Sequence, residues 1–157
     1  MVLSKQLGVF LNFVHNRFKL WVNESLQKSG YNITAEQFLL LDTLWMEGPL
    51  SQQKIADIML KDKNSVVKLV NSLEARGLVT REVNQNDRRE NIVTVTKRGI
   101  EIQEPVTQAA LNAVEQITSG LSDEEISTFI KALDTMAGNM DKDINLLFLA
   151  EIYPTKR

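Results

Sequence analysis

The fold is decided by residues 51–99, which read SQQKIADIMLKDKNSVVKLVNSLEARGLVTREVNQNDRRENIVTVTKRG. Ser51 and Asp62 are residue types that cap helix N-termini, and each precedes apolar residues at helical spacing. Further along, the pattern changes to two runs rich in β-branched residues, 78–83 and 92–96, separated by polar turn-forming residues. Two helices joined by a tight turn and followed by a β-hairpin make a winged helix-turn-helix, which we therefore predict for this stretch.

Helical spacing also dominates both flanks of this stretch. An N-terminal helix is predicted over about 3–28, and Thr34-Ala-Glu-Gln37 is a capping box that opens the next helix. After Gly99 helical spacing resumes, and Pro105 is expected to kink this helix or to reset its start. Ser122-Asp-Glu-Glu125 opens the last long helix in the same way. The sequence predicts a mainly α fold with a small β-hairpin wing, a winged helix-turn-helix plus terminal dimerisation helices.

The two ends of the chain carry more apolar surface than one winged helix needs to cover its back. Long apolar stripes at both chain ends usually pack against each other and often against a second subunit. The alternative is that they pack only within one chain. We expect residues 32–98 to form the DNA-binding lobe, and residues 1–31 and 99–150 to form a helical dimerisation lobe. The residues expected at the dimer interface are Phe10, Val14, Phe18, Leu133, Met140 and Leu147.

The helix that begins after Asp62 has two distinct faces at 100° per residue. The side that must face the core holds Val66, Leu69, Val70 and Leu73. The opposite side holds Asn64, Lys68, Asn71 and Ser72, with Ser65 and Val67 on the flanks, and it has no acidic residue. Asparagine suits adenine, lysine suits guanine or phosphate, and a valine methyl suits thymine. This face therefore favours insertion into a DNA major groove.

The net charge of −2 hides an asymmetry along the chain. From Lys54 to Arg98 there are ten basic and six acidic residues, whereas the rest of the chain has eight basic and fourteen acidic residues. A basic middle between acidic ends indicates that one region faces a polyanion, although charge alone is equally typical of a solvated face.

Residues 51–99 resemble the DNA-binding core of the multiple-antibiotic-resistance regulators, the MarR family. The family's wing pattern is an Asp, any residue, an Arg, five residues, an aliphatic residue, a Thr, two residues and a Gly. Here it is met by Asp87, Arg89, Val95, Thr96 and Gly99. The helix end LEARGLV at 73–79 also matches in register, and the resemblance covers nearly the whole chain.

The resemblance implies a homodimer whose terminal helices interlock, whose wings enter adjacent minor grooves, and which binds a near-palindromic operator on double-stranded DNA. It further implies a transcriptional regulator, most often a repressor, with small aromatic or phenolic effectors lodged between the two lobes. It also implies that Asp87 orients an arginine, either Arg89 or Arg76, and does not touch DNA.

The predicted DNA contacts come from three places in this stretch. Lys68, Asn64 and Ser65 are expected at base edges in the major groove. The start of the preceding helix is expected to meet phosphates, because a helix N-terminus attracts anions. The full set is Ser51, Gln52, Gln53, Lys54, Lys63, Asn64, Ser65, Val67, Lys68, Asn71, Arg88 and Arg89, with Arg76 and Asp87 as structural support for the wing.

Other chemistry is thinly represented. The chain has no cysteine and one histidine, which argues against thiolate catalysis, thiol-based redox sensing, and cysteine or histidine-rich metal sites. No phosphate-binding glycine loop or nucleophile elbow occurs, so we predict no catalytic site, metal or cofactor. No apolar run is long enough to span a membrane, and a cytoplasmic location is expected.

A winged helix that binds a protein partner and reads no DNA is the alternative to the regulator. Binding to duplex DNA that weakens steeply with salt distinguishes the two, because phosphate contacts release counterions.

Overall fold

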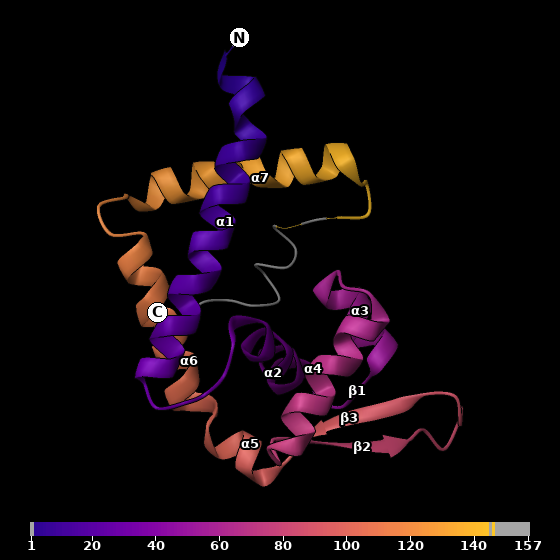
Figure 1. The fold of residues 1–157 in the computed structure, drawn as a ribbon. Helices are drawn as coiled ribbons and strands as arrows, with labels where there is room; N and C mark the ends of the chain where they lie inside the picture. Colours follow the sequence, from indigo (N-terminus) through magenta and orange to yellow (C-terminus); the bar gives the residue numbers. More distant parts are fainter. Residues whose placement is uncertain (1, 145, 147–157) are drawn as a thin grey trace. The chain divides into compact units, whose positions relative to one another are not determined.

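The computed structural model describes residues 2–144 and 146, with side chains from residue 5 onward (Figure 1). The chain divides into two compact units, residues 1–114 and residues 115–157. The predicted lobes, 32–98 against 1–31 with 99–150, are a different division that presupposes a second subunit, and they stay a prediction.

The fold is mainly helical with a small antiparallel sheet, as the sequence predicts. The helices are α1 (Val2–Lys28), α2 (Ala35–Glu47), α3 (Gln52–Met59), α4 (Lys63–Ala75), α5 (Lys97–Glu101), α6 (Gln103–Ile117) and α7 (Asp123–Met140). The strands are β1 (Leu50–Ser51), β2 (Val79–Val83) and β3 (Asn91–Val95). The order helix, helix, hairpin over 52–95 confirms the predicted winged helix-turn-helix.

Short polar side chains start the helices where the sequence places them. The Thr34 hydroxyl oxygen accepts a hydrogen bond from the Gln37 amide at 3.2 Å, and the Gln37 side-chain oxygen accepts one from the Thr34 amide at 3.0 Å. Ser51 and Asp62 cap α3 and α4 by accepting from the amides three residues on. These caps satisfy helix amides that have no partner inside the helix.

The wing is a three-stranded antiparallel sheet in the order β1-β3-β2. β2 and β3 form the predicted hairpin, with Val79 opposite Val95 and Val83 opposite Asn91. The third strand, β1, was not predicted. It is two residues long, with Leu50 opposite Val93, so only its pairing partner identifies it as a strand.

The core lies between α2, α3, α4 and the base of the wing. The predicted inward side of α4 is confirmed, since Val66, Val70 and Leu73 are fully buried and Leu69 packs against them. Leu40, Leu41 and Ile55 fill the same core from α2 and α3. This packing fixes which side of α4 is left for solvent or for a ligand.

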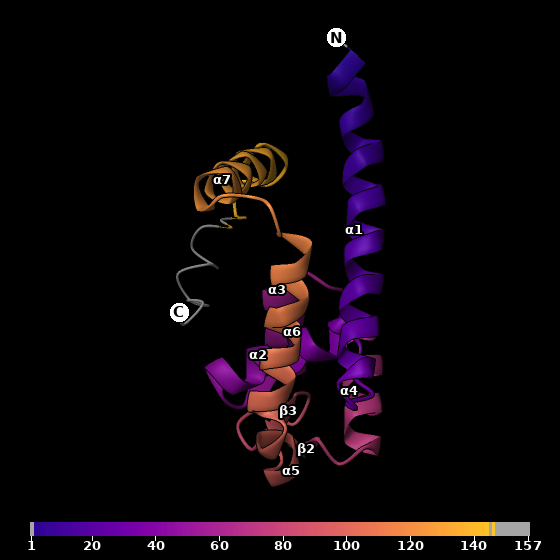
Figure 2. The same cartoon turned by 90° about the vertical axis from the view of Figure 1, so that its left-hand side faces the viewer.

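The C-terminal part of α1 is attached to this core, while its N-terminal part is not. Val22 and Leu26 are buried, and the Asn23 side-chain oxygen accepts a hydrogen bond from the Ala35 amide at 2.6 Å. The N-terminal half of α1 extends beyond the other elements of the first unit (Figures 1 and 2). Apart from the half-buried Leu11, the described side chains of that half are exposed.

Pro105 resets the helical run after the wing, as predicted. α5 ends at Glu101, and α6 begins at Gln103, which places Pro105 in the first turn of α6. Proline is tolerated there because amides of the first turn have no partner inside the helix.

The second unit contains α7, which opens with the predicted capping box. Ser122 and Glu125 bond reciprocally, and the hydrogen bond from the Ser122 amide lowers the pKa of Glu125. Along α7, Ala137 is buried whereas Phe129 and Met140 are exposed. Three large apolar side chains of this helix, Phe129, Ile130 and Met140, are thus exposed in a single chain.

Candidate nucleic-acid interface

The outward face of α4 is exposed and carries no acid. Lys63, Asn64, Lys68 and Asn71 are all exposed, and Val67 is half-buried beside them. The only acidic residue within α4, Glu74, lies in its last turn and is paired with an arginine of the wing. The face is therefore free of carboxylates along the length that could meet DNA.

The first turn of α4 is fixed by its N-cap. Asp62 accepts a hydrogen bond from the Ser65 amide at 2.9 Å and another from the Ser65 hydroxyl at 2.5 Å. These hydrogen bonds hold the pKa of Asp62 below its usual value, and the bond from the Ser65 hydroxyl has the larger effect. Because the Ser65 hydrogen is engaged, Ser65 offers a base edge only an acceptor.

The start of α3 presents polar side chains. Ser51 caps the helix, and Gln53 and Lys54 are exposed, with the Gln53 amide nitrogen donating to Asp57 at 2.9 Å. Gln52 differs from these neighbours, because it is only 5% exposed and its amide nitrogen has no hydrogen-bond partner in the part of the chain that the structure describes.

The wing tip carries two exposed arginines, Arg88 and Arg89. Asp87 accepts a hydrogen bond from the Arg89 amide at 3.0 Å, and the Arg89 Nε lies 3.8 Å from the same carboxylate oxygen. Arg76 instead donates to the Asn32 carbonyl. Of the two arginines considered for Asp87, the structure brings Arg89 to it and holds Arg76 elsewhere.

Two side-chain contacts that the sequence analysis missed hold α4 in place. Arg81 on β2 donates from Nε to Glu74 at 3.1 Å, and this interaction lowers the pKa of Glu74. The buried Gln37 donates to the Ser72 hydroxyl at 2.8 Å, which links α2 to α4. Gln37 was predicted only as part of a capping box, and its second role depends on the tertiary fold.

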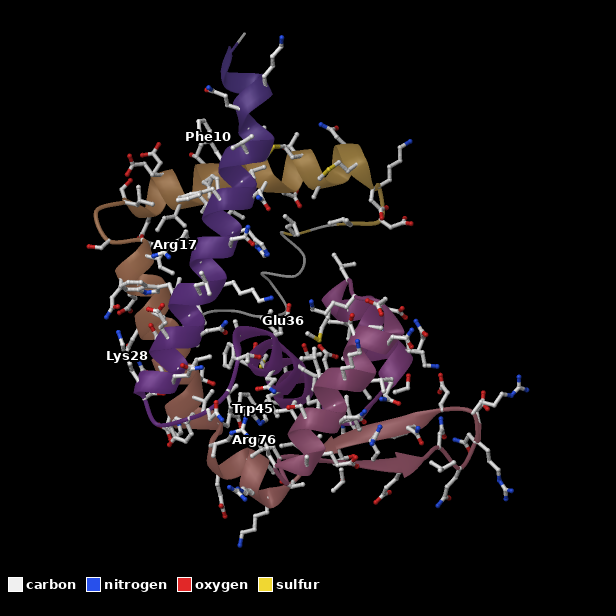
Figure 3. The ribbon with its side chains drawn as sticks, viewed as in Figure 1. Phe10, Arg17, Lys28, Glu36, Trp45 and Arg76 are labelled. Carbon is white, nitrogen blue, oxygen red and sulfur yellow. The ribbon has the colours of Figure 1, made fainter. Side chains whose placement is uncertain are left out.

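Glu36, the neighbour of Gln37, joins α1 to the turn before α4. Its Oε1 lies 2.8 Å from Lys19 Nζ and 3.2 Å from Lys61 Nζ, at the start of α2 (Figure 3). The hydrogen bond from Lys19 is the largest cause of the lowered pKa of Glu36. The partners are 17 and 25 residues away, so no local pattern could have indicated them.

Four of the five predicted dimer residues that the structure describes are exposed. Phe10, which is 52% exposed, projects from α1 (Figure 3), and Val14 and Phe18 are exposed as well. Leu133 is half-buried and Met140 is 81% exposed, while Leu147 lies outside the described residues. Leu7, Val9 and Phe13 extend this apolar surface over the N-terminal half of α1.

Within the part of the chain that the structure describes, no group of three or more histidine, aspartate and glutamate residues could hold a metal ion. No helix in that part is long and apolar enough to cross a bilayer.

A core of three helices, an exposed acid-free helix face and an arginine-tipped wing define a winged helix-turn-helix DNA-binding protein. The model of the MarR family matches residues 33–91, which span α2, α3, α4 and most of the wing. The chain belongs to the MarR family.

Three similar proteins extend this match beyond the winged helix. A putative transcriptional regulatory protein for the hcr operon of Thauera aromatica is 32% identical over 64% of this chain, and the match spans 61% of that protein's length, less than two thirds. The structure of reduced AbfR bound to DNA is 31% identical, with a TM-score of 0.72 over 90% of this chain and 96% of AbfR. BpsR of Bordetella bronchiseptica, whose DNA binding is regulated by 6-hydroxynicotinic acid, is 25% identical, with a TM-score of 0.76 over 84% of this chain and 98% of BpsR.

Proposed function

We propose that this protein is a sequence-specific regulator of transcription that binds double-stranded DNA as a homodimer. The observation that carries the proposal is the exposed face of α4, where Asn64, Lys68 and Asn71 stand without an acid. A helix of this kind fits a major groove, and the exposed arginines of the wing can enter the adjacent minor groove. The DNA-bound structure of AbfR, a relative over 90% of the chain, favours DNA over a protein partner.

The contacts divide into two kinds. Lys68, Asn64 and Ser65 meet base edges, with Val67 available for a thymine methyl. The start of α3, Ser51 to Lys54, together with Lys63, meets phosphates and fixes the register of α4 in the groove. Asn71 lies on the same exposed face as Lys68, one helical turn further along, and extends the contact.

Binding of the wild-type protein to mixed duplex DNA at low salt tests this function directly. The affinity is expected to fall linearly with salt on a double logarithmic plot, because each neutralised phosphate releases counterions. Genomic fragments selected by the purified protein and then sequenced would identify the operator. A protein that shifts no duplex at low salt would contradict the proposal and favour the protein-interaction module.

The homodimer is proposed from the uncovered apolar surface at both chain ends. Phe10, Val14 and Phe18 on α1 are exposed, as is Met140 on α7. An isolated monomer rarely presents so many large apolar side chains on one long helix. A two-fold dimer would bury them and would place two α4 helices about 34–36 Å apart, one turn of duplex DNA, on a near-palindromic site.

We expect light scattering at micromolar concentration to give twice the chain mass of 17.8 kDa. Phe10→Glu should shift the protein toward monomer and weaken DNA binding, because a charge would be buried in the interface. Gln6→Glu, an exposed polar position on the same helix, is the matched control and should leave the mass unchanged. A wild-type mass of 17.8 kDa would contradict the dimer.

The wing is expected to enter the minor groove through Arg89. Arg89→Ala should weaken operator binding and lower the salt slope by about one unit per half-site, with little change in thermal stability. The loss should be larger with A·T-rich flanks, because their narrow minor groove concentrates negative potential. Thr80→Ala, on an exposed position of β2, is the control. Equal binding of wild type and Arg89→Ala to both flanks would place the wing outside the groove.

As a regulator, the protein would act as a repressor by occupying a promoter. It would do so in the cytoplasm. A small aromatic or phenolic effector would release it, a proposal supported by the regulation of BpsR by 6-hydroxynicotinic acid. The proposal assigns no enzymatic activity, cofactor or metal. The effector is tested by calorimetric titration of the protein with a panel of aromatic acids and phenols. DNA binding is then measured in the presence of a saturating concentration of each compound that binds.

A further inference from the structure

Residues 32–37, which lead into α2 and form its first turn, are bonded to α1 on one side. The Asn23 side-chain oxygen on α1 accepts a hydrogen bond from the Ala35 amide at 2.6 Å. The Lys19 ammonium, also on α1, lies 2.8 Å from the Glu36 carboxylate. The start of α2 is therefore held to the helix that carries the exposed apolar surface proposed for the dimer.

The same segment is bonded to α4 on its other side. The Gln37 amide nitrogen donates to the Ser72 hydroxyl at 2.8 Å, and Arg76, the C-cap of α4, donates to the Asn32 carbonyl. All of these residues belong to the first unit. Residues 32–37 thus connect α1 to the C-terminal part of the helix that is proposed to read DNA.

Gln37 is the buried member of this connection. Its side chain is only 8% exposed, and its oxygen accepts the Thr34 amide at 3.0 Å while its nitrogen donates to Ser72. In the described part of the chain, this is the only side-chain hydrogen bond between α2 and α4, and the core that the two helices share is otherwise apolar. Apolar contacts have no preferred direction, whereas a hydrogen bond does. The bond from Gln37 therefore defines how α4 is turned on α2.

The position of Ser72 makes the DNA-reading end of α4 sensitive to this bond. Asn64 lies eight residues before Ser72 in the same helix, which is about 12 Å along the axis. A rotation of α4 by roughly 15° about Ser72 would move Asn64 by about 3 Å, close to the ~3.4 Å rise of one base pair. A small change at Ser72 is thus large enough to change the register of α4 on DNA.

We propose that Gln37 is a positioning residue, whose hydrogen bond to Ser72 fixes the angle of α4 relative to α1 and thereby the spacing of half-sites that the dimer accepts. The inference rests on the proposed function as a DNA-binding homodimer. Gln37 is buried and does not touch DNA. It acts by preorganisation, because two α4 helices held at a set angle engage both half-sites without an ordering cost.

Ser72→Ala tests the proposal, because it removes the bond to Gln37 and leaves the capping box of α2 intact. Its affinity for the operator selected by the wild type should fall about three- to tenfold. Its discrimination against operators with one base pair inserted or removed between the half-sites should shrink by a similar factor. Its affinity for a duplex with a single half-site should equal that of the wild type, because Asn64 and Lys68 are unchanged.

Variants of Gln37 provide the second arm. Gln37→Met should relax the spacing preference in the same way as Ser72→Ala, with an additional loss of thermal stability from the broken capping box. Gln37→Glu should keep the wild-type preference, because its carboxylate accepts the Thr34 amide at a helix start and accepts the Ser72 hydroxyl as donor. Gln27→Met, at an exposed glutamine of α1, is the matched control and should change neither quantity.

Two results would overturn the proposal while leaving the regulator intact. A parallel loss of affinity for the operator and the single half-site in Ser72→Ala would make Ser72 a direct DNA contact. Unchanged operator affinity and spacing preference in both Ser72→Ala and Gln37→Met would show that apolar packing alone sets the angle of α4. Failure of the wild type to bind any duplex, or to form a dimer, would instead contradict the proposed function itself.

Discussion

Gly99→Ala is expected to cost about 3 kcal/mol of folding free energy, because the added methyl group has no room. A Cβ at this position would clash with the Leu78 carbonyl oxygen and would lie 2.5 Å from Val95 Cγ1. The Leu78 carbonyl has no freedom to withdraw, because it accepts the Thr96 amide at 3.0 Å. The Gly99 carbonyl is itself held by the Trp45 indole at 3.2 Å.

Thermal unfolding measures this effect, with an expected drop in the melting temperature of roughly 6–12 °C. Gly138→Ala is the matched control. Gly138 lies inside α7 with nothing within 4 Å of an added Cβ, so alanine there should stabilise the helix by about 0.5–1 kcal/mol. If Gly99→Ala has the same melting temperature as the wild type, α5 does not approach the wing as closely as the structure indicates.

Lys68→Ala is expected to weaken operator binding by about 1–3 kcal/mol, which is roughly 5- to 150-fold. Lys68 is exposed on the acid-free face of α4, and the structure gives its ammonium no protein partner within the described residues. If Lys68 reads a base, the loss should appear on the operator and should flatten the preference at one position in each half-site. A phosphate contact would weaken operator and random DNA equally.

Fluorescence anisotropy on both duplexes at several salt concentrations separates these outcomes. Lys61→Ala is the matched control, because it removes the same charge from the turn before α4. The Lys61 ammonium is held by Glu36 at 3.2 Å and is not part of the outward face of α4. Unchanged binding of Lys68→Ala to both duplexes would remove Lys68 from the interface.

Local sequence determined the elements of the DNA-binding half and their faces. Ser51, Asp62 and Thr34 start helices because a short polar side chain satisfies amides only a few residues away. The period of Val66, Val70 and Leu73 fixed the buried side of α4, and therefore its exposed side. The β-branched runs 78–83 and 92–96 and the polar turn between them placed the wing, since a hairpin pairs strands that are near in sequence.

Only the tertiary structure decided contacts between distant residues. The pairing of β1 with β3, the bond from Gln37 to Ser72 and the two lysines on Glu36 join residues that no periodicity relates. The burial of Gln52 is the clearest case. Its sequence position, after an N-cap, predicts an exposed polar side chain. Instead it is buried, it lines a cavity together with residues of the wing, and its amide nitrogen has no hydrogen-bond partner among the described residues. Burial depends on which surfaces meet, and a one-dimensional pattern does not contain that information.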